Sequence, residues 1–357
     1  MGNFFRLFVL PVLLIGGIVT AIALGGRAVM MHRIESDRRI DAKEGVATLD
    51  AITIGGVPQY VSIRGVNRTR PLLLWVHGGP GQPLMPLAHE LNKGLETMFI
   101  VVHWDQRGAG LSNSSSVPRE SITVERLADD LCELAEHLLA RFQKEKLWLV
   151  AHDFGTVIAA LAANKKPDLF AAYVGVGQYV DMAESERVTY EWAVQRATAD
   201  GDSGAQAELE AIGPPPHDTP DESRRLRAMI RRLGGEVFNG DSVSYSGKAL
   251  VSPEYSLMQW FRIGAGEEVS WRHLHGTWMR LNLLQDALRI DVPVYLFHGR
   301  HDRVAPVGLA AKYAKELIAP AHEIIFFESS GHWPFLEEPR RFQQMLLDHV
   351  LVRTGPK

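Results

Sequence analysis

The chain has 357 residues, of which 46% are hydrophobic, so it can bury one large core or two smaller ones and is not disordered as a whole. Its formal net charge is -4, and its basic residues are interspersed with acids, which excludes the basic field expected of a nucleic-acid-binding protein. The single cysteine, Cys132, lies among apolar residues at helical spacing, and no intrachain disulfide can form.

The N-terminal segment differs from the rest of the chain. The run from Leu7 to Gly26 carries no charge and has about the length that a helix needs to cross a bilayer. A secretory signal usually has a shorter apolar region, and the only small-residue cleavage site, Ala21 to Ala23, lies inside the run. We therefore expect an uncleaved transmembrane anchor within residues 1–45, with a cleaved signal as the alternative. The basic residues after the run favour the cytosolic side for the folded part.

The next elements indicate an α/β fold. Two alternating segments, VATLDAITI and QYVSIRG, flank Gly55 and Gly56 and predict a hairpin. Short apolar runs such as LLLWVH, MFIVVHW and KLWLVAH then alternate with segments of helical period. This alternation predicts a mostly parallel sheet of about eight strands covered by helices. We assign residues 46–179 and 289–357 to this core.

Residues 180–288 interrupt the alternation. They contain a proline-rich turn, several helix-like segments and many aromatic residues, but no buried-strand runs. A run of ordinary surface helices would also fit. An inserted helical cap over the strand ends is the more economical interpretation.

Three groups of loop residues follow predicted strands and should meet at the carboxyl edge of the sheet, where open α/β folds place their sites. The first is HGGPG, in which the N–H of Gly79 can reach a developing oxyanion. The second is the turn HDFG, a strand-to-helix elbow that pushes Asp153 out of the sheet and directs the N–H of Phe154 toward the group it attacks. The third is a pair of late loops that contain Asp302 and His332.

These motifs resemble a known family. HGGPG followed by WDQRGAGLS is similar to the proline iminopeptidase branch of the α/β-hydrolase family, and the similarity extends from about residue 46 to the C-terminus, weakest in the cap. The chain order Asp153, Asp302, His332 is also that of nucleophile, acid and histidine in α/β hydrolases. The elbow departs from the branch, which has serine in G-x-S-x-G where this chain has AHDFG. That elbow is similar instead to epoxide hydrolases and haloalkane dehalogenases, whose nucleophile is aspartate.

An aspartate nucleophile disfavours peptidase chemistry. Its carboxylate is ionised at neutral pH, but after attack on an amide it would leave more readily than the amine. Attack on an epoxide carbon would instead give an alkyl ester that water can hydrolyse. The resemblance implies that His332 is the base for this water, that Asp302 orients His332, and that the N–H groups of Gly79 and Phe154 stabilise the oxyanion. Dehalogenation is disfavoured because Gly79 and Phe154 replace the usual halide donors.

Epoxide opening also needs an acid for the ring oxygen, usually a tyrosine of the cap. The expected cap contains Tyr190, Tyr245 and Tyr255, each of which could instead be a packing residue. We favour Tyr245 or Tyr255 as the donor because both lie in less regular sequence late in the cap.

We therefore expect a membrane-anchored hydrolase that needs no cofactor or metal and acts on a small apolar epoxide. Three explanations of Asp153 stay open: a natural nucleophile, a replacement for the serine of a proline iminopeptidase-like aminopeptidase or esterase, or a catalytically dead, ligand-binding homologue. The cap residues His273 and His275 do not suggest a metal site, because side chains two positions apart on a helix face in different directions.

Overall fold

The computed structural model describes residues 10–238 and 245–354. Its centre is an eight-stranded sheet with the order β1-β2-β4-β3-β5-β6-β7-β8. The strands are β1 (Val46–Ile54), β2 (Val57–Gly65), β3 (Leu72–Val76), β4 (Ile100–Asp105), β5 (Leu147–His152), β6 (Phe170–Val176), β7 (Val294–Gly299) and β8 (His322–Phe327). Strand β2 pairs antiparallel with β1 and β4, and the remaining neighbours are parallel. The predicted mostly parallel sheet is confirmed.

The central strands are buried on both faces. In β3, Leu72, Leu74 and Val76 belong to one buried cluster, whereas Leu73 and Trp75 belong to the other. Successive side chains of a strand point to opposite faces, so a strand covered on both sides must be apolar throughout. The continuous run LLLWV meets this requirement.

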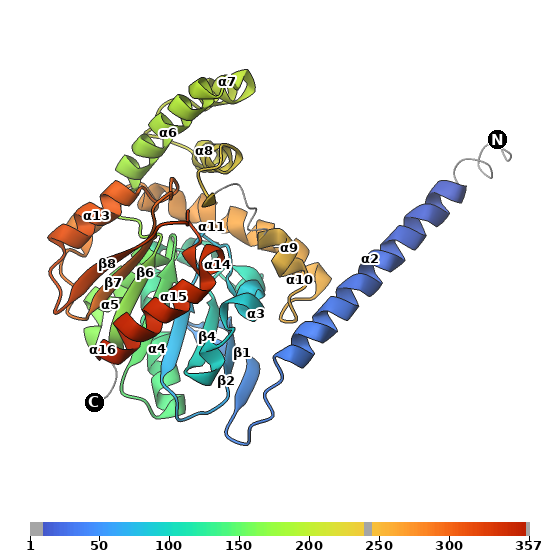
Figure 1. The fold of residues 1–357 in the computed structure, drawn as a ribbon, viewed down its shortest axis with the longest axis vertical. Coiled ribbons are helices and arrows are strands. Elements are labelled where there is room, and N and C mark those ends of the chain that lie inside the picture. The colour runs from blue at the N-terminus through green and yellow to red at the C-terminus, as the bar shows by residue number, and fades with distance from the viewer. Residues whose placement is uncertain (1–9, 239–244, 355–357) are drawn as a thin grey trace.

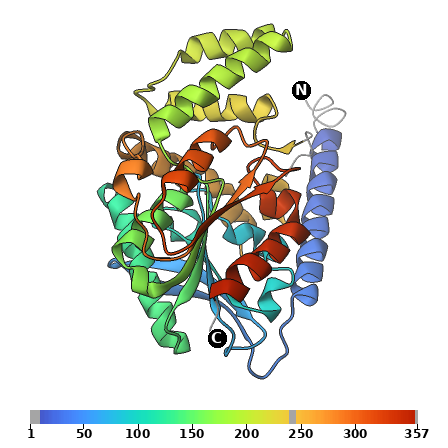
Figure 2. The same ribbon diagram turned by 60° about the vertical axis from the view of Figure 1, so that its left-hand side comes forward.

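Helices form a layer on each side of the sheet (Figures 1 and 2). One face is covered by α4 (Val124–Phe142), α5 (Gly155–Lys165) and α13 (Val307–Glu316). The other is covered by α3 (Ala88–Leu91), α14 (Pro334–Glu337), α15 (Pro339–Met345) and the π-helical segment η8 (Leu346–Leu351), which α16 (Val352–Thr354) follows. Short 3-10 turns complete the connections: η2 (Met85–Leu87), η3 (Leu95–Thr97), η4 (Gly110–Ser112), η5 (Arg119–Ser121) and η6 (Pro167–Leu169).

Between β6 and β7 the described chain forms helices and no strand. They are α6 (Met182–Ala199), α7 (Ser203–Ile212), α8 (Pro220–Arg232), α9 (Tyr245–Leu250), α10 (Leu257–Phe261), α11 (Ile263–Trp278) and α12 (Leu283–Asp286). Figures 1 and 2 show α6, α7 and α8 above one end of the sheet. We keep residues 180–288 as the proposed cap.

The N-terminal helix α2 (Leu10–Asp37) extends away from the sheet in Figure 1. Arg27, near its C-terminal half, donates hydrogen bonds of 2.8 Å to the carbonyl oxygens of Leu250 and Tyr255. Closer to the N-terminus, Val12 and Ile22 are 68% and 69% exposed.

The expected transmembrane span is not supported. Its first residues, 7–9, lie outside the described residues. Among the helices that the structure does describe, none combines the length and apolar character needed to cross a membrane.

Candidate active site

Asp153 lies at a sharp turn between β5 and α5. Its φ of 58° is in the left-handed region, which non-glycine residues rarely adopt. Such a turn directs the side chain away from the sheet, as at the nucleophile position of α/β hydrolases. The neighbouring HGGPG loop comes so close that a Cβ atom at Gly78 would collide with the Cβ of Asp153. The glycine is therefore required for the contact between the two loops.

One oxygen of Asp153 is held by two backbone amides. Oδ1 accepts a hydrogen bond of 2.9 Å from the N–H of Gly79 and a short one from the N–H of Phe154. These are the two N–H groups that the sequence assigned to an oxyanion hole. The structure thus brings both donors to the same atom of the elbow aspartate.

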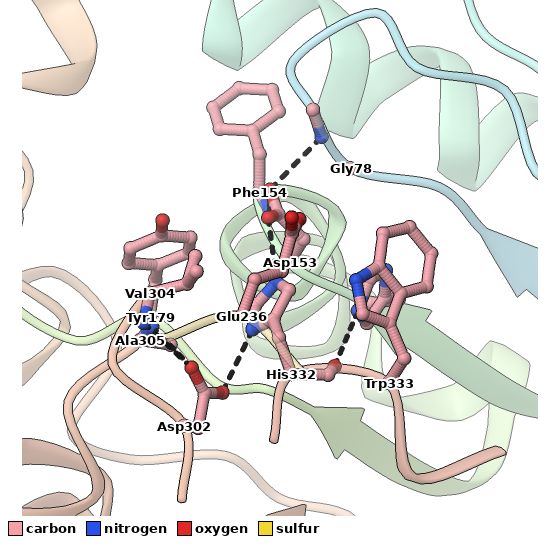
Figure 3. Close-up of polar contacts among 12 residues, drawn as sticks. Gly78, Asp153, Phe154, Tyr179, Glu236, Asp302, Val304, Ala305, His332 and Trp333 are labelled. Atoms are coloured by element: carbon pink, nitrogen blue, oxygen red, sulfur yellow. Dashed lines mark hydrogen bonds and ion pairs between the residues drawn. The ribbon is translucent and has the colours of Figure 1, made fainter. Parts of the chain in front are cut away.

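The other oxygen of Asp153 contacts His332. Oδ2 lies 2.8 Å from Nε2 of His332, whose Nδ1 lies 2.8 Å from Oδ2 of Asp302 (Figure 3). Asp302 is held by the N–H groups of Val304 and Ala305, which donate to its Oδ1 over 2.8 and 2.9 Å. All three side chains are buried. The late loops therefore meet the elbow in one continuous chain of hydrogen bonds.

Asp153, His332 and Asp302 influence one another's pKa values. Burial opposes the charge on His332, but Asp302 and the hydrogen bond to Asp153 outweigh it and raise the pKa of His332 to about 9. Burial likewise opposes the charge on Asp153, yet nearby Arg227 and His332 hold its pKa well below the ordinary value. With no substrate bound, the histidine is therefore an imidazolium between two carboxylates at neutral pH.

Two other buried histidines, His152 and His77, form hydrogen bonds beside the site. Nε2 of His152 lies 2.9 Å from the carbonyl oxygen of His332, and burial and the neighbouring imidazole lower the pKa of His152 to about 3. Burial also lowers the pKa of His77 to about 4, and its Nε2 accepts a hydrogen bond from the N–H of Gln106. Both are therefore neutral at physiological pH, and their hydrogen bonds connect the loops around the site.

Arg227 is a site residue that the sequence analysis missed. Its Nη2 donates to Oδ2 of Asp153 over 2.6 Å, and its Nη1 donates to the hydroxyl of Tyr179 over 2.9 Å. Arg227 lies on helix α8. A capping box between Thr219 and Glu222 fixes where this helix starts. The segment SRRLRAMIRRL predicts an amphipathic helix, but nothing in it singles out one of its arginines.

Tyr179 is the second missed residue. It follows β6, the strand next to β5, and its ring centroid lies 6.5 Å from that of His332. Its hydroxyl accepts the hydrogen bond from Arg227, and no acceptor for the proton of this hydroxyl is found among the described residues. Its place at the carboxyl end of a parallel strand was the signal that could have found it.

The three tyrosines expected as proton donors are not brought to Asp153. Tyr255 donates a short hydrogen bond to Asp105, and Tyr245 donates to the carbonyl oxygen of Pro83 over 2.7 Å. Tyr190 donates to the carbonyl oxygen of Leu209 over 3.1 Å. Each hydroxyl satisfies a structural acceptor, a use of tyrosine that sequence position does not distinguish from catalysis.

Two hollows flank Arg227, which lines both. A cavity of about 40 Å³ is mostly apolar, with Met182, Leu226, Ile230, Trp271 and Trp278 among its lining residues. A cleft of about 330 Å³ has many charged residues in its lining, which includes Gly79, Gln82, Arg224, Arg231 and Glu267. Gly79 and Arg227, which both line this cleft, also donate hydrogen bonds to the two oxygens of Asp153.

Comparison with known proteins shows the family of this chain. Residues 71–339 match the family model described as alpha/beta hydrolase fold. The chain is 32% identical over 313 residues to a protein of Bacillus subtilis (strain 168) named "Probable aminopeptidase YbaC", covering 87% of this chain and 98% of that one.

Solved structures share the fold. A proline iminopeptidase-related protein from Thermus thermophilus aligns with a TM-score of 0.60 and 23% identity, over 87% of this chain and 99% of its own. A laboratory-evolved variant of potato epoxide hydrolase aligns with a TM-score of 0.57 and 17% identity, over 85% of this chain and 99% of its own. The chain belongs to the alpha/beta hydrolase fold family, with proline iminopeptidase-like relatives.

Proposed function

We propose that the protein is an epoxide hydrolase that forms an alkyl ester on Asp153. The observation that carries the proposal is that the two oxygens of this carboxylate have different partners. Oδ1 already occupies the position held by the amides of Gly79 and Phe154, and Oδ2 lies beside His332. A serine would leave those amides free for the substrate, whereas an alkylated aspartate would present its own carbonyl oxygen to them.

The first step would open the ring. Oδ2 of Asp153 attacks a ring carbon, the bond from that carbon to the ring oxygen breaks, and the ring oxygen takes the proton of Tyr179. The guanidinium of Arg227, which donates to the Tyr179 hydroxyl, would stabilise the phenolate that this step leaves. Tyr179 would thus be the proton donor, the role that the sequence alone predicts for a tyrosine of the cap.

Alkylation would also convert His332 into a base. Esterification removes the negative charge of Asp153, which is one of the groups that keep His332 protonated. His332 can then release its proton through solvent to the Tyr179 phenolate. The neutral imidazole takes a proton from water, and the resulting hydroxide attacks the ester carbon.

The last step would regenerate the enzyme. The amides of Gly79 and Phe154 stabilise the oxyanion that develops on Oδ1. When the adduct collapses, the alkoxide leaves and takes the carboxyl proton, which gives the diol, ionised Asp153 and protonated His332. The aliphatic and aromatic lining of the small cavity beside Tyr179 suits the apolar part of such a substrate.

Isotope transfer tests this route. After several turnovers of an aryl epoxide in heavy-oxygen water, the peptide that contains Asp153 should carry the label, because water attacks the ester carbon and one of its oxygens remains on the enzyme. The peptide that contains Asp50 is the internal control. Diol formation without label on Asp153 would contradict the proposal.

The similarity to a probable aminopeptidase favours a second candidate, an aminopeptidase-like or esterase-like hydrolase whose serine has been replaced. It predicts that Asp153→Ser hydrolyses proline amides or esters that the unchanged protein leaves intact. Hydrolysis of these substrates by neither protein would remove this candidate. Their rapid hydrolysis by the unchanged protein would instead contradict the aspartate-ester mechanism.

A further inference from the structure

The contacts of Asp153 raise a question about its reactivity. Oδ2, the oxygen that would attack the epoxide, accepts hydrogen bonds from both His332 and Arg227. The contact with Nη2 of Arg227 is 2.6 Å long and joins opposite charges. A carboxylate oxygen that is tied to a guanidinium is a weaker nucleophile, because its charge is stabilised and its lone pairs are occupied. Nη2 of Arg227 must therefore release Oδ2 before attack, whereas the separate contact of Nη1 with Tyr179 is the one that ring opening uses.

Separating Arg227 from Asp153 costs free energy unless another anion takes the place of Asp153. Its side chain is only 15% exposed, and its other charged neighbour, Glu236, is 4.0 Å away. Removing one partner of a buried ion pair leaves an uncompensated charge, which is strongly unfavourable. An anion supplied by the substrate would replace Asp153 as the partner. The Nε of Arg227 is buried and has no hydrogen-bond partner within the described residues, so it lacks the acceptor that such an anion would supply.

The cleft beside Arg227 is suited to such an anion. Arg224, Arg227 and Arg231 lie three and four residues apart on α8, so they share one face of the helix, and all three line the cleft. Arg231 is already paired with Glu236. Arg224 is exposed and forms no hydrogen bond or ion pair in the part of the chain that the structure describes.

The other charged groups of the cleft do not cancel this positive charge. Arg225 is paired with Glu208 over 2.9 Å. Asp221 and Glu267 are the acidic lining residues, and burial raises the pKa of Glu267. The cleft is therefore lined by four arginines and two acids, and among the four arginines Arg224 has no hydrogen bond or ion pair within the described residues.

We propose that the substrate carries a carboxylate, which binds Arg224 and the Nε edge of Arg227 in the cleft and draws Arg227 away from Oδ2 of Asp153. This inference rests on the proposed function and names its substrate class: an epoxide with an apolar part and an acidic group. A carboxylate is the expected anion because Arg227 already holds one, that of Asp153, and a planar guanidinium fits another equally well. Substrate binding would then activate the nucleophile.

Binding can be tested without turnover. Calorimetry with octanoate and octanamide compares a carboxylate with a neutral group of the same size. Octanoate should bind about tenfold or more tightly than octanamide, the effect of one charge-assisted hydrogen bond, and Arg224→Ala should remove this preference. Arg232→Ala is the matched control, because Arg232 lies on the same helix but pairs with Asp202 and does not line the cleft. Equal affinity for both ligands, or a preference that survives Arg224→Ala, would overturn the inference.

Turnover separates this inference from the proposed function. We expect kcat/KM for a medium-chain epoxy acid to exceed that for its primary amide about tenfold, and Arg224→Ala to reduce the ratio. If both epoxides are opened equally well through Asp153, only the carboxylate site is refuted. If octanoate binds as expected but neither epoxide alkylates Asp153, the carboxylate site stands and the proposed reaction is refuted.

Discussion

Replacing Asp153 with asparagine should lower the pKa of His332. In the unchanged protein, the carboxylates of Asp302 and Asp153 raise that pKa from 6.5 to about 9 despite burial. Asparagine keeps the shape of the side chain but removes one of the two negative charges. This substitution also mimics the charge of the proposed alkyl ester, so it measures the change that would turn His332 into a base.

The size of the effect follows from these values. A pKa raised from 6.5 to about 9 is equivalent to about 3 kcal/mol of interaction that favours the protonated form. Because the pKa is higher in the folded state, this stabilisation is complete below about pH 6.5 and is lost as the pH rises through about 9. If Asp153 supplies even a third of it, the pKa of His332 should fall by about 1 in Asp153→Asn.

Nuclear magnetic resonance of histidine-labelled protein gives the pKa of His332 directly. A titration from roughly pH 5 to pH 10 covers both the ordinary value of 6.5 and the raised value of about 9. Denaturant unfolding near the two ends of this range should show a smaller loss of stability at high pH in Asp153→Asn than in the unchanged protein. Asp50→Asn is the control, since Asp50 forms a partly exposed pair with Arg141 on another part of the molecule. A pKa of His332 that stays at about 9 in Asp153→Asn would refute the coupling.

Three further substitutions test other contacts. Asp302→Asn should slow hydrolysis of the alkyl ester by up to about 10⁴-fold while leaving its formation measurable in single turnover, and equal loss of both steps would contradict the orienting role. Tyr179→Phe should slow ring opening by about 100-fold, whereas Tyr190→Phe should not, so equal rates in the two variants would exclude Tyr179 as the acid. Gly78→Ala should destabilise the protein by about 1–3 kcal/mol in denaturant unfolding, because the added Cβ collides with Asp153, and unchanged stability would contradict that contact.

The parts of the fold that local sequence encodes were predicted well. Continuous apolar runs predicted the buried strands, and the doublet Gly55-Gly56 predicted the hairpin, whose glycines have φ of 55° and 78°. Both signals come from residues next to one another in the chain. The positions of Gly79 and Asp153 could also be predicted from local sequence. Each lies just after a strand, and the end of that strand fixes where the loop begins.

The contacts between the proposed cap and the elbow were not predicted. Arg227 meets Asp153 across 74 residues of chain, and the choice among the arginines of α8 depends on how the helix packs over the sheet. Residue type and position in the expected cap point to Tyr190, Tyr245 and Tyr255, but carbonyl and carboxylate acceptors already bind their hydroxyls. Side-chain hydrogen bonding over such separations is a property of tertiary packing, which sequence periodicity does not record.

Intact-protein mass spectrometry of His332→Gln, incubated with a panel of aryl and fatty epoxides, tests the central claim most directly. Ester formation does not need the base but ester hydrolysis does, so the variant should accumulate an adduct equal in mass to one epoxide and mapped to Asp153. No adduct across the panel, together with no epoxide opening by the unchanged protein, would contradict the aspartate nucleophile. That result would leave a replaced-serine hydrolase or a ligand-binding homologue.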